Sequence, residues 1–211
     1  MHTHNIQVLL LDADGVVVLP NRFALYRQRQ LGISEEMASK FFDGPFLACL
    51  VGKADLKQAI APFLRRWKWR GTVDSFLQRW FDEDNALDPR VMVEVRRVRR
   101  AGLRCGLATN QERYRLEYMQ QVMGLQQVFD AIFCSAEVGV LKDDPRFYER
   151  VTRQLDVPRQ AVMFWDDSAR NVQAARAFGW QAELYQGFED LQSALADYLP
   201  PAEQPSATPV R

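Results

Sequence analysis

The sequence predicts an α/β protein with a doubly wound parallel sheet and a smaller helical unit inserted after the first strand. Short apolar runs recur along the chain, and the last four alternate with segments of helical length. Apolar strands separated by helices are typical of a parallel sheet that is covered on both faces. Between Val18 and about Leu87 the pattern becomes helical without a clear strand. The chain of 211 residues is long enough for one such domain with a modest insertion.

The expected strands are Ile6 to Leu11, Leu103 to Ala108, Ala131 to Cys134, Ala161 to Trp165 and Gln181 to Tyr185. Five further segments have the pattern of helices, at about 88–101, 112–123, 144–155, 168–178 and 188–198. In the first of these helices, Val91, Val95 and Val98 form an apolar stripe and arginines occupy much of the remaining surface. We interpret the arginines as a solvated face because no aromatic residues lie among them.

The inserted unit at residues 18–87 is rich in phenylalanine and tryptophan, and residues 1–17 and 88–199 form the expected α/β core. The stretch RRWKWR at 65–70 mixes basic and aromatic residues as single-strand binders do. An amphipathic helix with Phe63 and Trp67 packed inward is the simpler interpretation. Residues 200–211 carry four prolines among small and polar residues, so we expect a disordered tail.

Composition argues against several classes of partner. Twenty-seven basic residues balance 27 acidic ones, so neither a nucleic acid nor an anionic membrane is indicated. No apolar run approaches the roughly 18 residues of a spanning helix and no signal peptide is evident, so we expect a soluble cytoplasmic protein, monomer or homodimer. Cys49, Cys105 and Cys134 lack close pairing, which predicts reduced thiols. His2 and His4 are interpreted as solvated.

Polar residues follow the predicted strands at their carboxyl ends. They are Asp12 and Asp14 after the first strand, Thr109 and Asn110 after the second, Lys142 after the third, and Asp166 and Asp167 after the fourth. In a doubly wound sheet, ligands bind at this edge, so we expect these residues to converge.

Four converging carboxylates would repel one another unless a cation lies among them. An oxygen-only ligand set without histidine or cysteine favours a hard divalent ion, and Mg²⁺ is the first choice. The ion and Lys142 would let a carboxylate approach a phosphate dianion. One carboxylate can then attack phosphorus while its neighbour protonates the leaving oxygen and later activates water.

Four segments resemble, in order and spacing, the four motifs of the haloacid-dehalogenase-like phosphohydrolases. They are DADGV at 12–16, TN at 109–110, Lys142, and DDSARNVQAARAFG from residue 166. The resemblance extends from Val8 to about Tyr185 and implies a Rossmann-like core. The inserted unit at 18–87 resembles the helical cap of one subgroup, and it is called the cap below.

The resemblance implies a catalytic role for each matching residue. Asp12 would be the nucleophile that becomes an aspartyl phosphate, and Asp14 would be the general acid and base. Thr109, Asn110 and Lys142 would bind the phosphoryl group.

The resemblance also implies a metal site. Mg²⁺ would be held by Asp12, by the backbone carbonyl of Asp14 and by Asp167, with Asp166 behind them or acting through water. Family members that dehalogenate lack the second aspartate, because a halide leaving group needs no proton. The presence of Asp14 therefore favours phosphoryl transfer.

One departure from the family pattern follows the lysine. Proline commonly comes next, whereas here Asp143 and Asp144 precede Pro145. Asp144 fits a helix N-cap with Pro145 in the first turn. Two extra negative charges would weaken the hold of Lys142 on phosphate, unless Asp143 points to solvent.

The leading hypothesis is a Mg²⁺-dependent phosphatase acting on a small phosphorylated metabolite. The segments FFDGPF, GVLKDDPRFYERV and FWDDSARNVQAARAFG resemble a subgroup with sugar 1-phosphate phosphatases, so glucose 1-phosphate is the first substrate to assay. In the cap, Gly44, Phe46 and Lys53 are candidate substrate contacts. Two alternatives stay open: a phosphomutase of the β-phosphoglucomutase type, and a regulatory or binding protein that keeps the fold but turns over poorly.

Overall fold

The structure is a computed structural model that describes residues 6–20 and 22–196. His2, His4 and the tail at 200–211, for which solvated or disordered states are expected, lie outside these residues. Within the described ranges, no helix combines the length and the apolar character needed to span a membrane.

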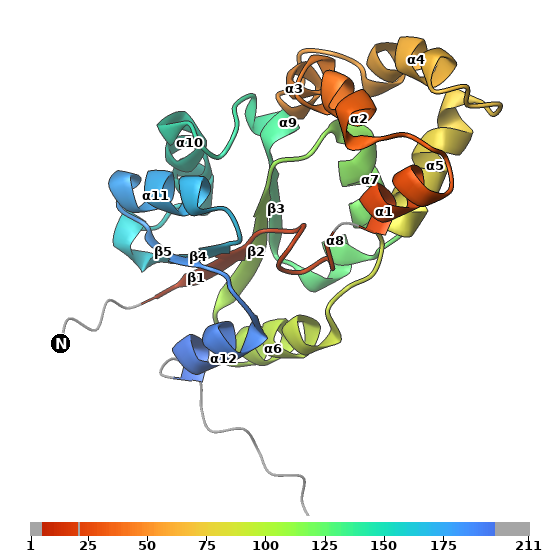
Figure 1. The fold of residues 1–211 in the computed structure, drawn as a ribbon. Coiled ribbons are helices and arrows are strands. Elements are labelled where there is room, and N and C mark those ends of the chain that lie inside the picture. The colour runs from red at the N-terminus through yellow and green to blue at the C-terminus, as the bar shows by residue number, and fades with distance from the viewer. Residues whose placement is uncertain (1–5, 21, 197–211) are drawn as a thin grey trace, which may run out of the picture.

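Five parallel strands form one sheet in the order β3-β2-β1-β4-β5, which confirms the predicted doubly wound fold (Figure 1). The strands are β1 (Val8–Leu11), β2 (Arg104–Thr109), β3 (Ala131–Cys134), β4 (Val162–Asp166) and β5 (Gln181–Leu184). They coincide closely with the predicted runs. Because β1 is central, the strand order reverses beside it, and this is the point where such sheets bind ligands.

Helices cover both faces of the sheet. They are α6 (Pro89–Arg100), α7 (Arg113–Gln121), α8 (Leu125–Val128), α9 (Ser135–Val138), α10 (Pro145–Leu155), α11 (Ala169–Phe178) and α12 (Phe188–Ala196). Side chains alternate along β1, so that Leu9 and Leu11 pack with residues of α6 and α12. Val8 and Leu10 pack with residues of α10 and α11 on the opposite face. The two layers together bury the central strand completely.

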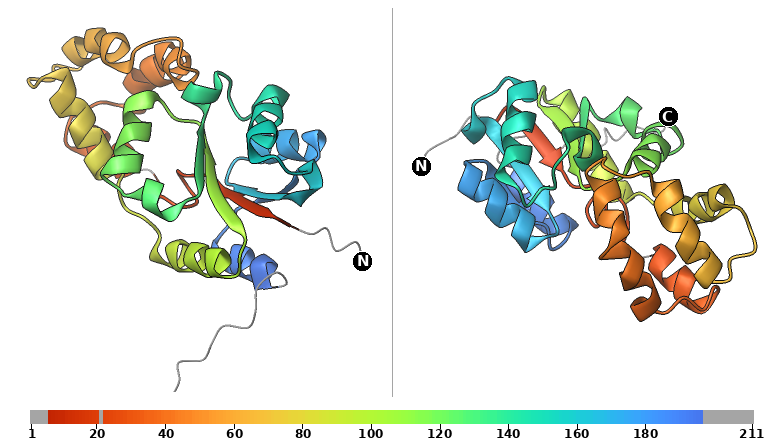
Figure 2. Two further views of the ribbon diagram at one scale, coloured as in Figure 1. Left: turned by 180° about the vertical axis from the view of Figure 1, so that it is seen from behind. Right: turned by 90° about the horizontal axis from the view of Figure 1, so that it is seen from above.

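The cap contains five helices, α1 (Arg22–Arg29), α2 (Glu35–Phe42), α3 (Pro45–Leu50), α4 (Leu56–Arg66) and α5 (Val73–Glu83). They lie together beyond the carboxyl ends of the central strands (Figures 1 and 2). An aromatic cluster centred on Phe41 and Phe76 fills the space between them. The helix expected through RRWKWR ends at Arg66, because the chain turns at Lys68 with φ 57°. Trp67 nonetheless packs inward as expected.

Two adjacent segments join the cap to the core. Val18 forms an antiparallel bridge with Leu87, and the Leu19 amide donates to the Ala86 carbonyl at 2.8 Å. The Asp88 amide donates to the Val17 carbonyl at 2.9 Å. The outgoing and returning chains are therefore paired directly beside the turn that follows β1.

Candidate active site

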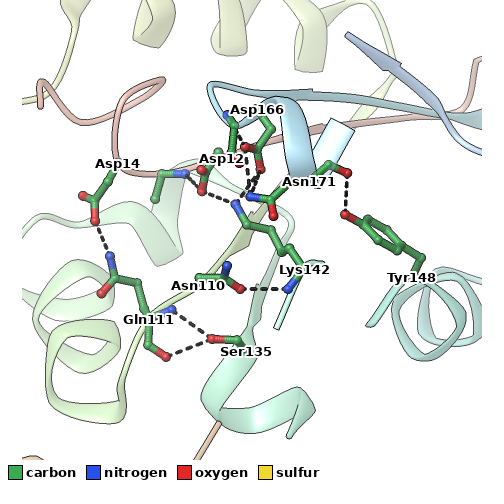
Figure 3. Close-up of polar contacts among 11 residues, drawn as sticks. Asp12, Asp14, Asn110, Gln111, Ser135, Lys142, Tyr148, Asp166 and Asn171 are labelled. Atoms are coloured by element: carbon green, nitrogen blue, oxygen red, sulfur yellow. Dashed lines mark hydrogen bonds and ion pairs between the residues drawn. The ribbon is translucent and has the colours of Figure 1, made fainter. Parts of the chain in front are cut away.

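The sheet register places the first and fourth strand ends side by side. Leu11 pairs with Trp165, so the next residues, Asp12 and Asp166, occupy equivalent positions on neighbouring strands. Lys142 Nζ lies 2.7 Å from Asp12 Oδ1 and 2.7 Å from Asp166 Oδ2 (Figure 3). All three side chains are buried. Three of the predicted segments thus meet in one charged cluster.

Lys142 is held in place through its backbone. Its amide donates to Asn110 Oδ1 at 3.0 Å, so the TN segment positions the lysine. The two acidic residues after it turn elsewhere. Asp143 pairs with Arg170 at 2.6 Å, and Asp144 caps α10 by accepting a hydrogen bond from the Arg146 amide at 2.9 Å.

Asp166 has partners for both of its carboxylate oxygens. Oδ1 accepts from the Ser168 amide at 2.8 Å, and Asn171 Nδ2 lies 3.1 Å from each oxygen. The Tyr148 hydroxyl donates to the Asn171 carbonyl at 2.8 Å and fixes the start of α11 (Figure 3). Asp166 therefore orients Lys142 from behind, which leaves Asp12 and Asp167 as the more available carboxylates.

Burial and charge perturb the acidic residues of this cluster. Burial raises the pKa of Asp12 above its usual range; Lys142 opposes this rise, and the charge of Asp166 adds to it. Asp167 is exposed at the edge of the cluster, and partial desolvation is the main cause of its raised pKa, followed by the charge of Asp166. If all three carboxylates were ionised, the site would carry more negative charge than Lys142 alone balances.

The cluster fits a hard divalent cation. Asp12, Asp166 and Asp167 each offer a carboxylate oxygen, and these oxygens all lie within 4.8 Å of one another. Asp12 Oδ1 is bonded to the Ala13 amide and to Lys142, whereas Oδ2 accepts no hydrogen bond from the described residues. A Cβ at Gly15 would lie 2.1 Å from Asp167 Oδ2, so only glycine leaves room for this carboxylate. Carboxylate oxygens are the ligands that Mg²⁺ prefers.

Asp14 points away from Asp12 toward α7 (Figure 3). Gln111 Nε2 donates to Asp14 Oδ2, and Arg115 Nη2 lies 3.8 Å from Oδ1. The Asp14 side chain is 51% exposed, whereas that of Arg115 is only 4% exposed. The predicted acid and base is therefore accessible and is held by two residues that sequence reasoning missed.

Arg115 also connects α7 to the end of the cap. Its guanidinium donates to the carbonyl oxygens of Phe81, at 3.2 Å, and of Asp84. On the other side of the cap, the Ser135 hydroxyl donates to the Leu50 carbonyl at 2.6 Å. These contacts fix the cap to the α7 side of the core.

The remaining predicted site residues are divided between two places. Thr109 is buried at the end of β2, and its hydroxyl bonds to no described residue. Gly44 precedes α3, and Phe46 packs against Phe41, Phe42 and Trp80 inside the cap. Lys53 lines a recess against α7.

None of the three predicted cap contacts, Gly44, Phe46 and Lys53, lines the cavity above the carboxylates. That cavity measures about 410 Å³ and extends from Asp14 and Asp167 to the helices α1, α2 and α5 of the cap. The three expected contacts are conspicuous loop or aromatic residues in the sequence, but helix packing decides which side chains face the cavity.

The chain thus combines a parallel α/β core, acidic strand ends and a helical cap, and similarity to known proteins assigns it to a family. The model of the haloacid dehalogenase-like hydrolase family matches residues 6–179. The chain belongs to this family.

Individual relatives agree with this assignment. Protein CbbY of Cereibacter sphaeroides is 25% identical over 201 residues, which cover 87% of this chain and 85% of that protein. Phosphatase MT3486 of Mycobacterium tuberculosis (strain CDC 1551 / Oshkosh) is 33% identical over 88 residues, 41% of each chain. Apart from CbbY, the chain spans less than half the length of the first curated relatives.

The fold also matches solved structures. The HAD family enzyme BT-2542 of Bacteroides thetaiotaomicron has a TM-score of 0.77 and 17% identity over 90% of this chain and 98% of that one. A complex of that enzyme with magnesium and inorganic phosphate has a TM-score of 0.72 over 86% of this chain and 94% of that one, at 17% identity. The similarity establishes the shared fold.

Proposed function

We propose that the protein is a Mg²⁺-dependent phosphatase that hydrolyses a small phosphorylated metabolite through an aspartyl phosphate on Asp12. The observation that carries this proposal is the contact of one buried lysine with two carboxylates, at 2.7 Å each, beside the third carboxylate, Asp167. Lys142 compensates part of the negative charge that a carboxylate nucleophile would otherwise present to an anionic substrate. The name of the M. tuberculosis relative and the magnesium and phosphate complex of BT-2542 support the same activity.

The proposed metal site uses side chains already close together. Asp12 and Asp167, with the backbone carbonyl of Asp14, would hold the ion, while Asp166 fixes Lys142 beside it. When bound, Mg²⁺ would neutralise charge on the phosphoryl oxygens and favour attack by an anion.

The proposed chemistry divides hydrolysis into two steps. A carboxylate oxygen of Asp12 bonds to phosphorus while the bond from phosphorus to the leaving oxygen breaks, and protonated Asp14 gives its proton to that oxygen. Asp14, now a carboxylate, takes a proton from the water that attacks the aspartyl phosphate, which frees phosphate and restores Asp12. Asp14 reaches the leaving oxygen by rotating away from Gln111, to which it is bonded here. Thr109, with its free hydroxyl, and Lys142 are the proposed donors to the phosphoryl oxygens.

The family also includes haloacid dehalogenases. Displacement of a halide needs neither a leaving-group proton nor a metal, so it would leave Asp14 and Asp167 without a function. The accessible carboxylate of Asp14, two residues after Asp12, favours phosphoryl transfer.

The test is phosphate release from p-nitrophenyl phosphate, glucose 1-phosphate, nucleotides and phospho-acids, with Mg²⁺ or with EDTA. We expect release that requires Mg²⁺ and that disappears in Asp12→Asn. Mass spectrometry of rapidly quenched wild type should detect one phosphoryl group on the peptide that contains Asp12. Absence of phosphate from the whole panel, or turnover by Asp12→Asn, would contradict the proposal. Isomerised sugar phosphate in place of free phosphate would favour the phosphomutase alternative.

A further inference from the structure

The cavity above the carboxylates has a floor and a wall of different character. Asp14, Gly15 and Asp167 form the floor, and Asp167 also belongs to the carboxylate cluster with Asp12, at which the phosphoryl group of the proposed reaction would bind. The opposite wall is mainly apolar. Its apolar members are Leu19, Pro20, Phe23, Ala24, Phe42 and Trp80, and its charged members are Arg27, Glu35 and Asp84. The volume of about 410 Å³ is within the range of small-molecule sites. The group attached to a phosphate bound at this cluster would extend over the floor and meet the apolar wall.

We propose that the leaving group bound in this cavity is an apolar alkyl or aryl group, so that the substrates are phosphate monoesters of hydrophobic alcohols. This inference rests on the proposed phosphatase function and narrows its substrate class. It replaces the sugar phosphate that the sequence segments suggest.

The aromatic wall is preformed. Trp80 of α5 stacks on Phe23 of α1, with centroids 5.4 Å apart and planes 21° apart. Its ring also meets Phe42 of α2 edge-on at 5.3 Å. Three helices thus hold the rings in fixed positions, so a ligand would not have to order them.

Leu19 gives a second indication. It is one of the few large apolar side chains that remain exposed, at 41%, and it lies in the segment that leaves the turn after β1. A hydrophobic leaving group would cover Leu19 and remove apolar surface from water, which is favourable. A polyhydroxylated group would leave this surface without a matching partner.

Arg27 is the cationic side chain of the wall, and its guanidinium is already bonded within the protein. The buried guanidinium of Arg27 donates to the carbonyl oxygens of Ile33, at 3.4 Å, and Ser34, at 3.3 Å, and pairs with Glu35. Asp84 Oδ1 accepts a hydrogen bond from the Phe23 amide at 2.8 Å. A sugar ring requires several donors and acceptors for its hydroxyls, and burying them unmatched is costly. The guanidinium of Arg27 and Asp84 Oδ1 are instead engaged in contacts within the cap.

The charge of the cavity excludes another group of substrates. Four acidic residues line it, Asp14, Glu35, Asp84 and Asp167, against the single guanidinium of Arg27. A leaving group with its own carboxylate or second phosphate would be repelled once the first phosphate is bound. Neutral apolar leaving groups avoid this repulsion.

A chain-length series tests the inference. The substrates are ethyl, butyl, hexyl and octyl phosphate, whose leaving alcohols are nearly equally acidic, so differences in kcat/KM report binding of the chain. We expect kcat/KM to rise about two- to four-fold per methylene until the cavity is filled. Hexyl phosphate should also exceed glucose 6-phosphate, which is likewise an ester of a primary alcohol.

Two leucines provide matched variants. Leu19→Ala should lower the ratio of kcat/KM for hexyl phosphate to that for ethyl phosphate several-fold. Leu25, 50% exposed on α1 and absent from the cavity lining, is the control, and Leu25→Ala should keep the wild-type ratio. Neither substitution creates a hole in the cap core, because both side chains are exposed. Equal ratios in the two variants would overturn the inference.

Binding supplies a readout that does not need turnover. In Asp12→Asn with Mg²⁺, hexyl phosphate should change tryptophan fluorescence, and Trp80→Phe should remove most of that change while keeping an aromatic wall. If the alkyl phosphates release phosphate but kcat/KM does not change with chain length, the proposal of an apolar leaving group is overturned and the phosphatase function stands. Hexyl phosphate that binds without release from any ester would instead overturn the phosphatase while supporting the cavity assignment. If hexyl phosphate does not bind and no ester releases phosphate, both the phosphatase function and the cavity assignment are overturned.

Discussion

Replacement of Lys142 by methionine tests the charge balance on which the site depends. Methionine has a similar length and no charge. The lysine ammonium lies 2.7 Å from both Asp12 and Asp166, and its side chain is 1% exposed. Breaking a buried ion pair by removing one partner costs about 3–5 kcal/mol, because the remaining charge is uncompensated. At about 2–4 °C per kcal/mol for a chain of this size, the melting temperature should fall by roughly 6–20 °C.

The loss should depend on pH in a defined direction. Burial already raises the pKa of Asp12, and loss of Lys142 removes the contribution that opposes this rise. A carboxyl group whose folded pKa is raised contributes stability that is fully present below its unfolded pKa and is lost as pH rises through the folded value. The difference between wild type and Lys142→Met should therefore be small near pH 4 and largest at neutral pH.

The assay is thermal unfolding followed by circular dichroism at pH 4.5 and 7.5, in EDTA and in Mg²⁺. Mg²⁺ should recover part of the loss at pH 7.5, because a ligand that binds only the folded state stabilises it. Lys53→Met is the control, because Lys53 is exposed and forms no ion pair among the described residues. If Lys142→Met in EDTA at pH 7.5 melts at the temperature of the control, the lysine does not balance the two carboxylates.

Three further predictions address single contacts. Asp12→Asn should keep the wild-type circular dichroism spectrum and lose phosphate release. A spectrum typical of an unfolded chain would instead indicate that Asp12 is needed for folding. Gly15→Ala should weaken Mg²⁺ binding in calorimetry, since its Cβ would lie 2.1 Å from Asp167 Oδ2 at φ 86°; unchanged affinity would remove Asp167 from the metal site. Asp88 caps α6 by accepting a hydrogen bond from the Arg90 amide at 2.8 Å. Asp88→Ala should therefore lower the free energy of unfolding, measured with urea, by about 1 kcal/mol. Arg90 lowers the pKa of Asp88, so this difference should be present at neutral pH and disappear as pH falls below the folded pKa; a constant difference would contradict the ionic contribution.

The sheet and the meeting of its acidic strand ends were predictable for a physical reason. Five short runs are mainly apolar, which is the pattern of strands in a sheet covered on both faces, and the observed strands coincide with them. In a parallel sheet all carboxyl ends lie at one edge, so the topology alone brings Asp12 and Asp166 together. The approach of Lys142 depends on the loop after β3; it was expected because this residue follows a strand end, and the motif order of the family implied the same.

The partners of Asp14 were not predictable in the same way. Gln111 and Arg115 belong to QERYRLEYMQQ, which has charged residues throughout and gives no indication of which arginine faces inward. Arg115 is buried because carbonyl groups of the cap, far away in sequence, accept its hydrogen bonds. The cavity wall presents the same difficulty, since α1, α2 and α5 each contribute one ring, and only their packing brings Phe23, Phe42 and Trp80 together.

The acidic residues after Lys142 are the sequence feature that most favoured a protein with little turnover, and their positions weaken that argument. Asp143 pairs with Arg170, which is 80% exposed, and Asp144 pairs with Arg146, which is 63% exposed. Each negative charge thus has a cation closer than Lys142 and in contact with water, where screening shortens its reach. The ammonium of Lys142 lies between two carboxylates of the cluster, and among the described residues it forms no ion pair with Asp143 or Asp144. The charge that a phosphate would meet is therefore set mainly by the cluster of Asp12, Asp166 and Asp167 with Lys142. The charges of Asp143 and Asp144, which depart from the family pattern, are balanced by arginines outside this cluster.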